Sequence, residues 1–231
     1  MMEMSLSERA TSLEGVYSRA MPWEPGTAQP PKRIEDALWL FFSDEEACLV
    51  EAIVDRLIPS DDLGPGGKDA GCAVFIDRQL AGPYGRGAGN YVSGPFSPGT
   101  ITQGYQEAAS PAERYRAGLR EVDRYVKAMF GGRGFPELAP NEQDHVLSNL
   151  ESGIAHPLTG VCAKEFFKLI LKNTMEGFFA DPVYGGNRNM IGWKLVGFPG
   201  ARYDYRDWVE RHNEPYPFPP VGIMGSPEWK G

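Results

Sequence analysis

The chain has 231 residues, of which 42% are hydrophobic and 12% aromatic, and its formal net charge is -8. This length and composition predict one folded domain with extensions and exclude a chain that is disordered throughout. The negative charge argues against nucleic acid as a partner, because phosphate binding requires dense Lys and Arg. No apolar run approaches the roughly 20 residues of a membrane span, so we expect no direct span.

The N-terminal part predicts an arm followed by two helices. Residues 1–40 contain several turn-forming residues and predict an irregular arm. Ser43 and Glu46 have the spacing of a capping box, and the apolar residues that follow repeat at helical spacing until Pro59. A second helix is predicted over residues 70–81, where a Gly-Pro pair ends the apolar pattern.

Residues 82–106 form a glycine-rich loop that contains seven glycines and three prolines. Connections in compact domains usually have about 4–6 residues, so a loop of this length is expected to have a role. The run from Gly85 to Gly89 superficially resembles a phosphate-binding turn, but no strand precedes it and no lysine–hydroxyl pair follows it. We therefore interpret it as a surface loop that a partner orders.

Three further helices complete the predicted core over residues 41–180. The first starts with a Ser-Pro-x-x capping box at Ser110 and ends at a Gly-Gly pair, and the others cover residues 141–152 and 161–180. The apolar face of the first of these helices is expected to contain Tyr115, Leu119, Val122, Val126 and Met129. The fold class is thus mainly α: a compact bundle of about five helices with long irregular glycine- and proline-rich loops and an extended C-terminal arm.

Residues 181–231 predict a glycine-rich turn and an extended arm, with at most one helix near residues 203–211. Four prolines between residues 215 and 220 favour a polyproline-like course, which loses little conformational entropy on binding. The alternative is an arm that folds back over its own core to bury its aromatic side chains. Because large aromatics and Arg supply much of the energy in protein interfaces, the interface candidates are Arg188, Trp193, Arg202, Tyr205, Trp208, Tyr216, Phe218 and Trp229.

No residue set has the spacing of a usual catalytic, metal or cofactor site. The three histidines lack carboxylates or cysteines at metal-site spacing, and Asp61-Asp62 lacks the oxygen-ligand pattern of a cation loop. Asp181 and Arg188 predict a local clasp instead of a catalytic dyad, with Asn187 satisfying adjacent backbone groups. We therefore expect no catalytic residue, no metal and no cofactor in this chain.

Three runs of residues carry a resemblance to a known family: TMEGFFADPVYGGNRNMIGWKLVGFPGA at 174–201, DRLIPSDDLGPGGKDAGCAVFIDRQLAGPYGRG at 55–87, and RYDYRDWVERHNEPYPFPPVGIMG at 202–225. From about Phe41 to its end, the chain resembles the small subunit, subunit 3, of gluconate 2-dehydrogenase. The resemblance implies a non-catalytic subunit of a membrane-associated FAD and cytochrome c complex. Such a subunit supports the folding, stability or export of a large flavoprotein partner. FAD and haem c are expected on partner subunits, namely the large dehydrogenase subunit and a multihaem cytochrome c.

The resemblance also implies a periplasmic location, peripheral to the inner membrane through the partner subunits. The chain departs from the family pattern in one respect, because residues 1–40 lack the basic and then apolar start of a secretory signal. Two other functional classes remain open at this point. One is a standalone small sugar-acting enzyme, and the other is a general protein-binding module.

The three cysteines, Cys48, Cys72 and Cys162, are odd in number and have no CxxC spacing, so a zinc site or a dense disulfide framework is not indicated. Each falls in or beside a predicted helix, where a buried, inert thiol is the favoured interpretation, although one disulfide remains open. In an oxidising compartment at most two of the three could pair with each other. Cys162, at the start of the last long helix, is expected to be the accessible one.

Overall fold

The computed structural model describes residues 38–90, 94–97, 99–100, 102–103, 108–154, 162–202 and 204–223. Most of the predicted arm over residues 1–40 therefore lies outside the described residues, as does Trp229, and the loop over 82–106 is described in part. The described ranges are helical and contain no strand, with isolated bridges at Asp61–Gly64 and Gly200–Val221. The predicted mainly α fold is confirmed.

The first two helices begin close to their predicted positions. Helix α2 spans Asp44–Leu57, and the capping box is present, because Ser43 Oγ accepts from the Glu46 amide while the Glu46 carboxylate accepts from the Ser43 amide. Helix α3 spans Cys72–Ala81 and starts after Gly71, whose φ is 75°. Glycine suits this left-handed position because it has no Cβ. The chain thus turns sharply before α3 instead of continuing the helix from residue 70.

Helix α4 spans Pro111–Met129, and its start contains the predicted capping box between Ser110 and Glu113. Four of its five predicted core positions are buried, but Met129 is exposed. Its assignment to the apolar face is wrong because the buried stripe ends at Val126 and the last turn lies at the surface. Helix α5 spans Pro140–Ser152 and buries Val146, Leu147 and Leu150.

Helix α6, Ala163–Phe179, is the central element of the bundle and contacts α2, α3, α4 and α5 as well as α7. Two glycines allow neighbouring helices to approach it closely. A Cβ on Gly118 of α4 would lie 2.3 Å from the ring of Phe166, and one on Gly177 of α6 would lie 3.0 Å from the ring of Phe75. Because protein interiors are close-packed, these positions favour glycine over any larger residue.

The chain after α6 differs from the prediction. It forms 3₁₀ helices over Pro182–Tyr184 and Arg188–Met190 and then a short helix α7 over Ile191–Val196. The helix predicted near 203–211 is reduced to a 3₁₀ turn over Arg206–Trp208. Helix α7 has only six residues and follows left-handed residues, so it carries no usable apolar period in the sequence. Contacts with α6 hold it in place.

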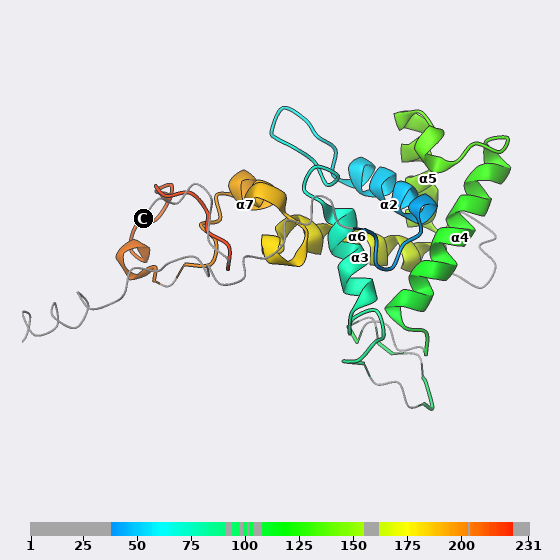
Figure 1. The fold of residues 1–231 in the computed structure, drawn as a ribbon, viewed down its shortest axis with the longest axis horizontal. Coiled ribbons are helices and arrows are strands. Elements are labelled where there is room, and N and C mark those ends of the chain that lie inside the picture. The colour runs from blue at the N-terminus through cyan, green and yellow to red at the C-terminus, as the bar shows by residue number, and fades with distance from the viewer. Residues whose placement is uncertain are drawn as a thin grey trace, which may run out of the picture.

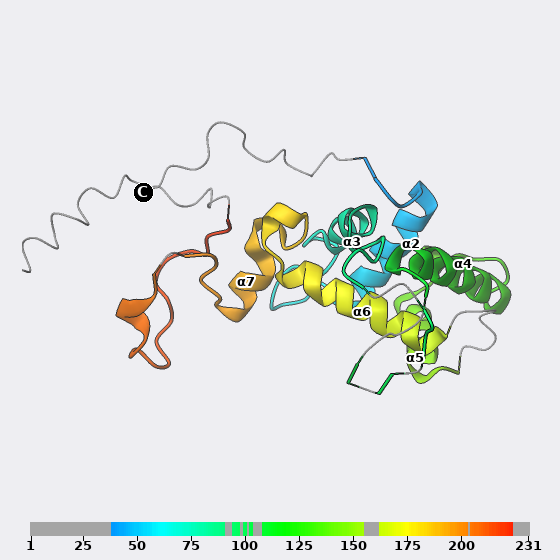
Figure 2. The same ribbon diagram turned by 90° about the horizontal axis from the view of Figure 1, so that it is seen from below.

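Figures 1 and 2 show the bundle of α2 to α6 at one side of the molecule, with α7 beside the end of α6. Residues 199–202 and 204–223 extend beyond α7, away from the bundle, in both views. We call these residues the aromatic lobe. In the part of the chain that the structure describes, no helix combines the length and the apolar character that crossing a membrane requires.

Candidate functional site

The glycine-rich turn after α6 docks on the loop that precedes α3. The Arg188 amide donates to the Ala70 carbonyl at 3.0 Å. A Cβ on Gly71 would lie 2.6 Å from Arg188 Nε and 2.9 Å from the Gly185 carbonyl oxygen, so the contact requires glycine. Two segments that are more than a hundred residues apart in the sequence are therefore joined. We call residues 70–71 and 180–193 the junction.

Asn187 lies at the centre of this junction and is fully buried with a left-handed backbone, φ 46°. Its Nδ2 donates to the Ala180 carbonyl at the end of α6, and its Oδ1 accepts from the Gly192 amide in α7, both at 2.8 Å. The sequence prediction that Asn187 satisfies adjacent backbone groups is confirmed. The amide side chain ties the end of α6 to the start of α7.

The predicted clasp between Asp181 and Arg188 is wrong. The Asp181 carboxylate instead accepts from the Val183 amide at 3.0 Å and from the Ile223 amide at 2.7 Å. The Arg188 guanidinium lies against Gly71 on the other side of the junction. Asp181 therefore pins the far end of the aromatic lobe to the turn after α6.

Helix α7 is bonded to the end of α6 through Trp193 and exposes other apolar side chains to solvent. Trp193 is 6% exposed, and its indole Nε1 donates to the Phe179 carbonyl at 2.8 Å. The ring of Phe198 packs edge-on against Trp193 with 5.2 Å between centroids, yet Phe198 remains 47% exposed. Leu195 and Val196 are also exposed. We call Leu195, Val196 and Phe198 the α7 patch.

The aromatic lobe closes on itself instead of running out as an extended arm. The Ala201 amide donates to the Val221 carbonyl at 2.6 Å, and the Val221 amide donates to Pro199 at 3.2 Å. The half-buried Tyr216 packs edge-on against Tyr205, Trp208 and Phe218 at centroid distances of 5.0–5.9 Å. The proline-rich segment therefore returns along the residues that precede it.

Two arginines complete the lobe. The Arg202 guanidinium lies 5.0 Å from the Tyr216 ring centroid and 5.6 Å from that of Phe218, and it donates to the Pro219 carbonyl. Arg211 lies 4.4 Å from the Trp208 ring and pairs with Glu214 at 4.0 Å. Cation–π contacts of this kind are favourable at partly exposed sites. The lobe thus has an internal set of contacts of its own.

The structure separates the interface candidates into three groups. The aromatic lobe brings together Arg202, Tyr205, Trp208, Tyr216 and Phe218. Arg188 and Trp193 belong to the junction, where Trp193 supports the α7 patch from beneath, and Trp229 lies outside the described residues. The sequence did not nominate the α7 patch itself, although its apolar residues directly before and after the helix-ending Gly197 were a signal for it.

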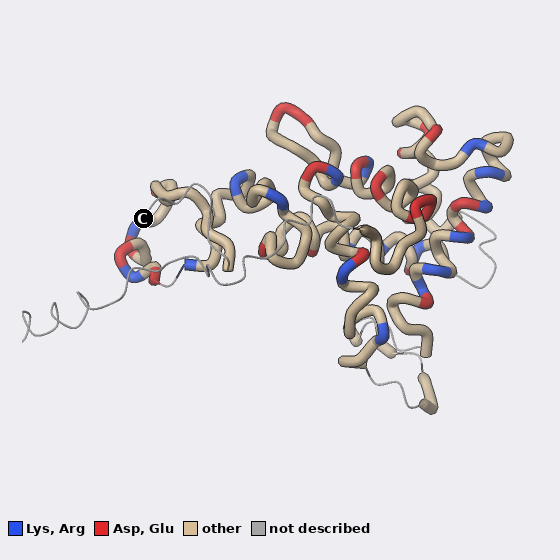
Figure 3. Tube along the Cα trace, in the orientation of Figure 1, with Lys and Arg blue, Asp and Glu red and all other residues tan. Residues whose placement is uncertain are grey.

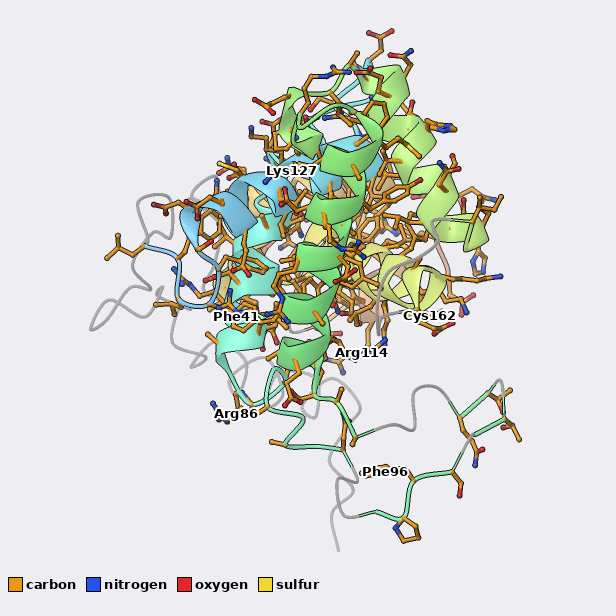
Figure 4. The ribbon with its side chains drawn as sticks, turned by 90° about the vertical axis from the view of Figure 1, so that its right-hand side faces the viewer. Phe41, Arg86, Phe96, Arg114, Lys127 and Cys162 are labelled. Atoms are coloured by element: carbon orange, nitrogen blue, oxygen red, sulfur yellow. The ribbon has the colours of Figure 1, made fainter. Side chains whose placement is uncertain are left out.

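A second feature that the sequence missed is a clamp on the segment before α2. The buried Asp77 carboxylate of α3 accepts the backbone amides of residues 40–42, each at 2.9 Å. From α4, the Arg116 guanidinium donates to the Phe41 carbonyl and lies 4.0 Å from the Phe41 ring centroid. Figure 4 shows Phe41 beside α3 and α4. A lone acid within the apolar run of α3 was the available signal.

The start of the glycine-rich loop is ordered by the chain's own core. Asn173 of α6 accepts from the hydroxyls of Tyr115 at 2.9 Å and Tyr84 at 3.3 Å, and Gly85 O accepts from the Ala112 amide. Burial raises the pKa of both tyrosines, so their hydroxyls stay protonated and donate. For residues 82–90, the interpretation that a partner orders the loop is therefore wrong.

All three cysteines are free thiols in the structure. Burial raises the pKa of the Cys72 thiol to about 12, as expected for an inert core position. Cys48 on α2 and Cys162 before α6 are exposed. The interpretation as a buried thiol is therefore wrong for Cys48, whereas the expectation that Cys162 is accessible is confirmed. An exposed position in the middle of a helix results when the residue falls on the solvent side of the apolar stripe.

A groove of about 490 Å³ lies between α2 and α4, and its lining includes Cys48, Leu49, Leu119, Arg120 and Pro136. Among its charged lining residues, Asp123 pairs with Lys127 at 2.8 Å, and Glu46 pairs with Arg116 of α4. Across the described ranges, no three His, Cys, Asp or Glu side chains form a group that could hold a metal ion. The α7 patch and the aromatic lobe remain the candidate site, and its character is that of a binding surface.

Comparison with known protein families gives a match to the model of gluconate 2-dehydrogenase subunit 3 over residues 44–200. The matched range contains α2 to α7, the junction and the α7 patch, and it ends where the aromatic lobe begins. Searches of curated proteins and of solved structures found no match.

Proposed function

Because the chain belongs to the gluconate 2-dehydrogenase subunit 3 family, we propose that it is the non-catalytic small subunit of a gluconate 2-dehydrogenase-like complex. In this complex it binds a large FAD-containing dehydrogenase subunit and supports the folding, stability or export of that subunit. Electrons leave the flavin through a multihaem cytochrome c subunit. The complex acts in the periplasm, peripheral to the inner membrane through the partner subunits.

The α7 patch is the observation that supports this proposal most strongly. Single exposed apolar residues are ordinary on protein surfaces, but the patch gathers three of them within four positions of the chain. Its base is fixed, because Trp193 and Asn187 bond to the end of α6 and a Cβ on Gly192 would lie 2.1 Å from the Phe178 carbonyl oxygen. A rigid apolar surface loses little entropy when it binds a partner.

The aromatic lobe extends this surface with the residue types that dominate interfaces. Phe218 is exposed, the half-buried Arg202 stacks on its ring, and the exposed Arg211 stacks on Trp208. Tyr, Trp and Arg contribute most where water is excluded from the contact. We therefore place the contact with the large subunit on the α7 patch and the adjoining lobe.

This contact is tested by charge substitution in the patch. Leu195→Glu and Phe198→Glu are expected to weaken binding of the large subunit by on the order of 10- to 100-fold, because each removes an apolar anchor and buries a carboxylate. Tagged full-length chain is co-expressed with the large subunit, and the flavin absorbance that co-purifies is measured. Ile154→Glu is the matched control, since Ile154 is 72% exposed after α5 and lies outside the patch.

The supporting role is tested separately by expressing the large subunit with and without this chain. We expect more soluble, flavin-loaded large subunit and more of it in the periplasm when the chain is present. If the yield of flavin-loaded large subunit in the cytoplasm and in the periplasm is the same with and without this chain, a role in folding or export is contradicted.

For the charge substitutions, recovery of as much flavin with Leu195→Glu and Phe198→Glu as with the wild type would contradict the assigned surface.

A further inference from the structure

The loop between α2 and α3 forms a rigid projection. We call residues 58–67 the finger. At its tip, the backbones of Asp61 and Gly64 exchange two hydrogen bonds of 3.0 and 3.1 Å, and Asp61 Oδ1 accepts from the Leu63 amide at 2.8 Å. Lower down, Ser60 Oγ accepts from the Gly66 amide and donates to Asp69, both at 2.8 Å. Side-chain and backbone bonds thus hold the whole turn.

Two glycines close the base of the finger, Gly66 against the finger's own first residues and Gly67 against α2. A Cβ on Gly66 would lie 2.2 Å from the Ile58 carbonyl oxygen, and one on Gly67 would lie 2.6 Å from that of Val54. The Gly67 amide donates to Ile58 at 2.7 Å. Because the same loop continues into Gly71 and the junction, the finger is held in a fixed position relative to α7. Figures 1 and 2 both show it beside α7.

This rigid support ends in an exposed leucine. Leu63 at the tip is 78% exposed, so its side chain is available for contact with another protein. Asp61 and Asp62 directly precede Leu63 in the chain, and Figure 3 shows acidic residues at the end of the projection. An apolar side chain on a pre-ordered turn is suited to insertion into a pocket, because little entropy is lost when it binds.

We propose that the finger is a second docking element, which inserts Leu63 into an apolar pocket with a basic rim on the large subunit. The basic rim follows from the two exposed carboxylates beside Leu63, because Lys or Arg opposite them would make the two surfaces complementary in charge. The position of the finger beside α7 places both elements on the same partner. This proposal rests on the proposed function, since it assigns a further contact to the same partner.

The test measures binding of the full-length chain to the isolated large subunit by titration. Leu63→Ala is expected to weaken the affinity by on the order of 10-fold, and Ile154→Ala, at a similarly exposed residue, is expected to leave it unchanged. Asp62→Lys is expected to slow association and to reduce the dependence of the rate on salt. Thermal melting of each variant alone should match that of the wild type, since both side chains are exposed.

The outcomes separate the two proposals. If Phe198→Glu abolishes binding while Leu63→Ala and Asp62→Lys behave as Ile154→Ala does, the finger is not a docking element and the proposed function stands. If the wild-type chain itself does not bind the large subunit, the proposed function fails. Loss of affinity in Leu63→Ala without loss of thermal stability supports the finger.

Discussion

Replacing Asn187 with alanine is expected to destabilise the protein strongly through three effects. The Gly192 amide loses its partner in a buried position, which costs about 1–3 kcal/mol, and the partly buried Ala180 carbonyl loses its own at a smaller cost. Alanine in the left-handed region costs roughly 1–2 kcal/mol more. The total is about 4 kcal/mol, which lowers the melting temperature of a protein of this size by about 8–16 °C.

Two related variants separate these contributions. Asn187→Gly removes both hydrogen bonds but accepts the left-handed backbone, so it is expected to cost about 1–2 kcal/mol less than Asn187→Ala. Asn189 has a similar backbone, φ 54°, with an exposed side chain, so Asn189→Ala is expected to show only the backbone cost. Thermal melts followed by circular dichroism measure all three. If Asn187→Ala melts no lower than Asn189→Ala, the hydrogen bonds of Asn187 do not stabilise the junction.

Three further predictions concern the bundle. Asp77→Ala is expected to lower the free energy of unfolding by at least about 3 kcal/mol and to speed proteolysis near Phe41, because three backbone amides lose a charged acceptor. An unchanged rate of digestion near Phe41 would contradict the role of Asp77 as a clamp. In the folded protein Cys48 and Cys162 are expected to react with a thiol reagent while Cys72 is not. Folding raises the pKa of the Cys72 thiol from 9.0 to about 12. The contribution of the protonated thiol to the free energy of unfolding is therefore present below pH 9 and is lost as the pH rises toward 12. In Cys72→Ala this part of the fall in stability at high pH should be absent.

The helices of the bundle could be located from the sequence because their signals are local. Ser43 with Glu46 and Ser110 with Glu113 form the capping boxes that their spacing predicted. Most of the predicted apolar positions are buried, and Met129 fails because a periodic pattern does not show where neighbouring helices end. Asn187 was also assigned correctly, since its partners lie within seven residues of it.

The candidate site depends on contacts between distant residues, which a single sequence does not show. Helix α7 is too short to have a readable period and is held by Asn187 and α6. Arg188 was expected to pair with Asp181, but the approach of Gly71 from another part of the chain places it elsewhere. The α7 patch and the finger were therefore missed as surfaces.

By itself the sequence determined the mainly α class, the starts of α2 and α4 and, through the runs at 55–87 and 174–201, the family. Only the tertiary structure decided which side chains face solvent after α6. The prolines between residues 215 and 220 suggested an extended arm, yet the bonds from Ala201 to Val221 and from Ile223 to Asp181 close the lobe. Proline restricts φ locally, whereas the direction of a segment is set by the partners that its remaining amides and rings find in space.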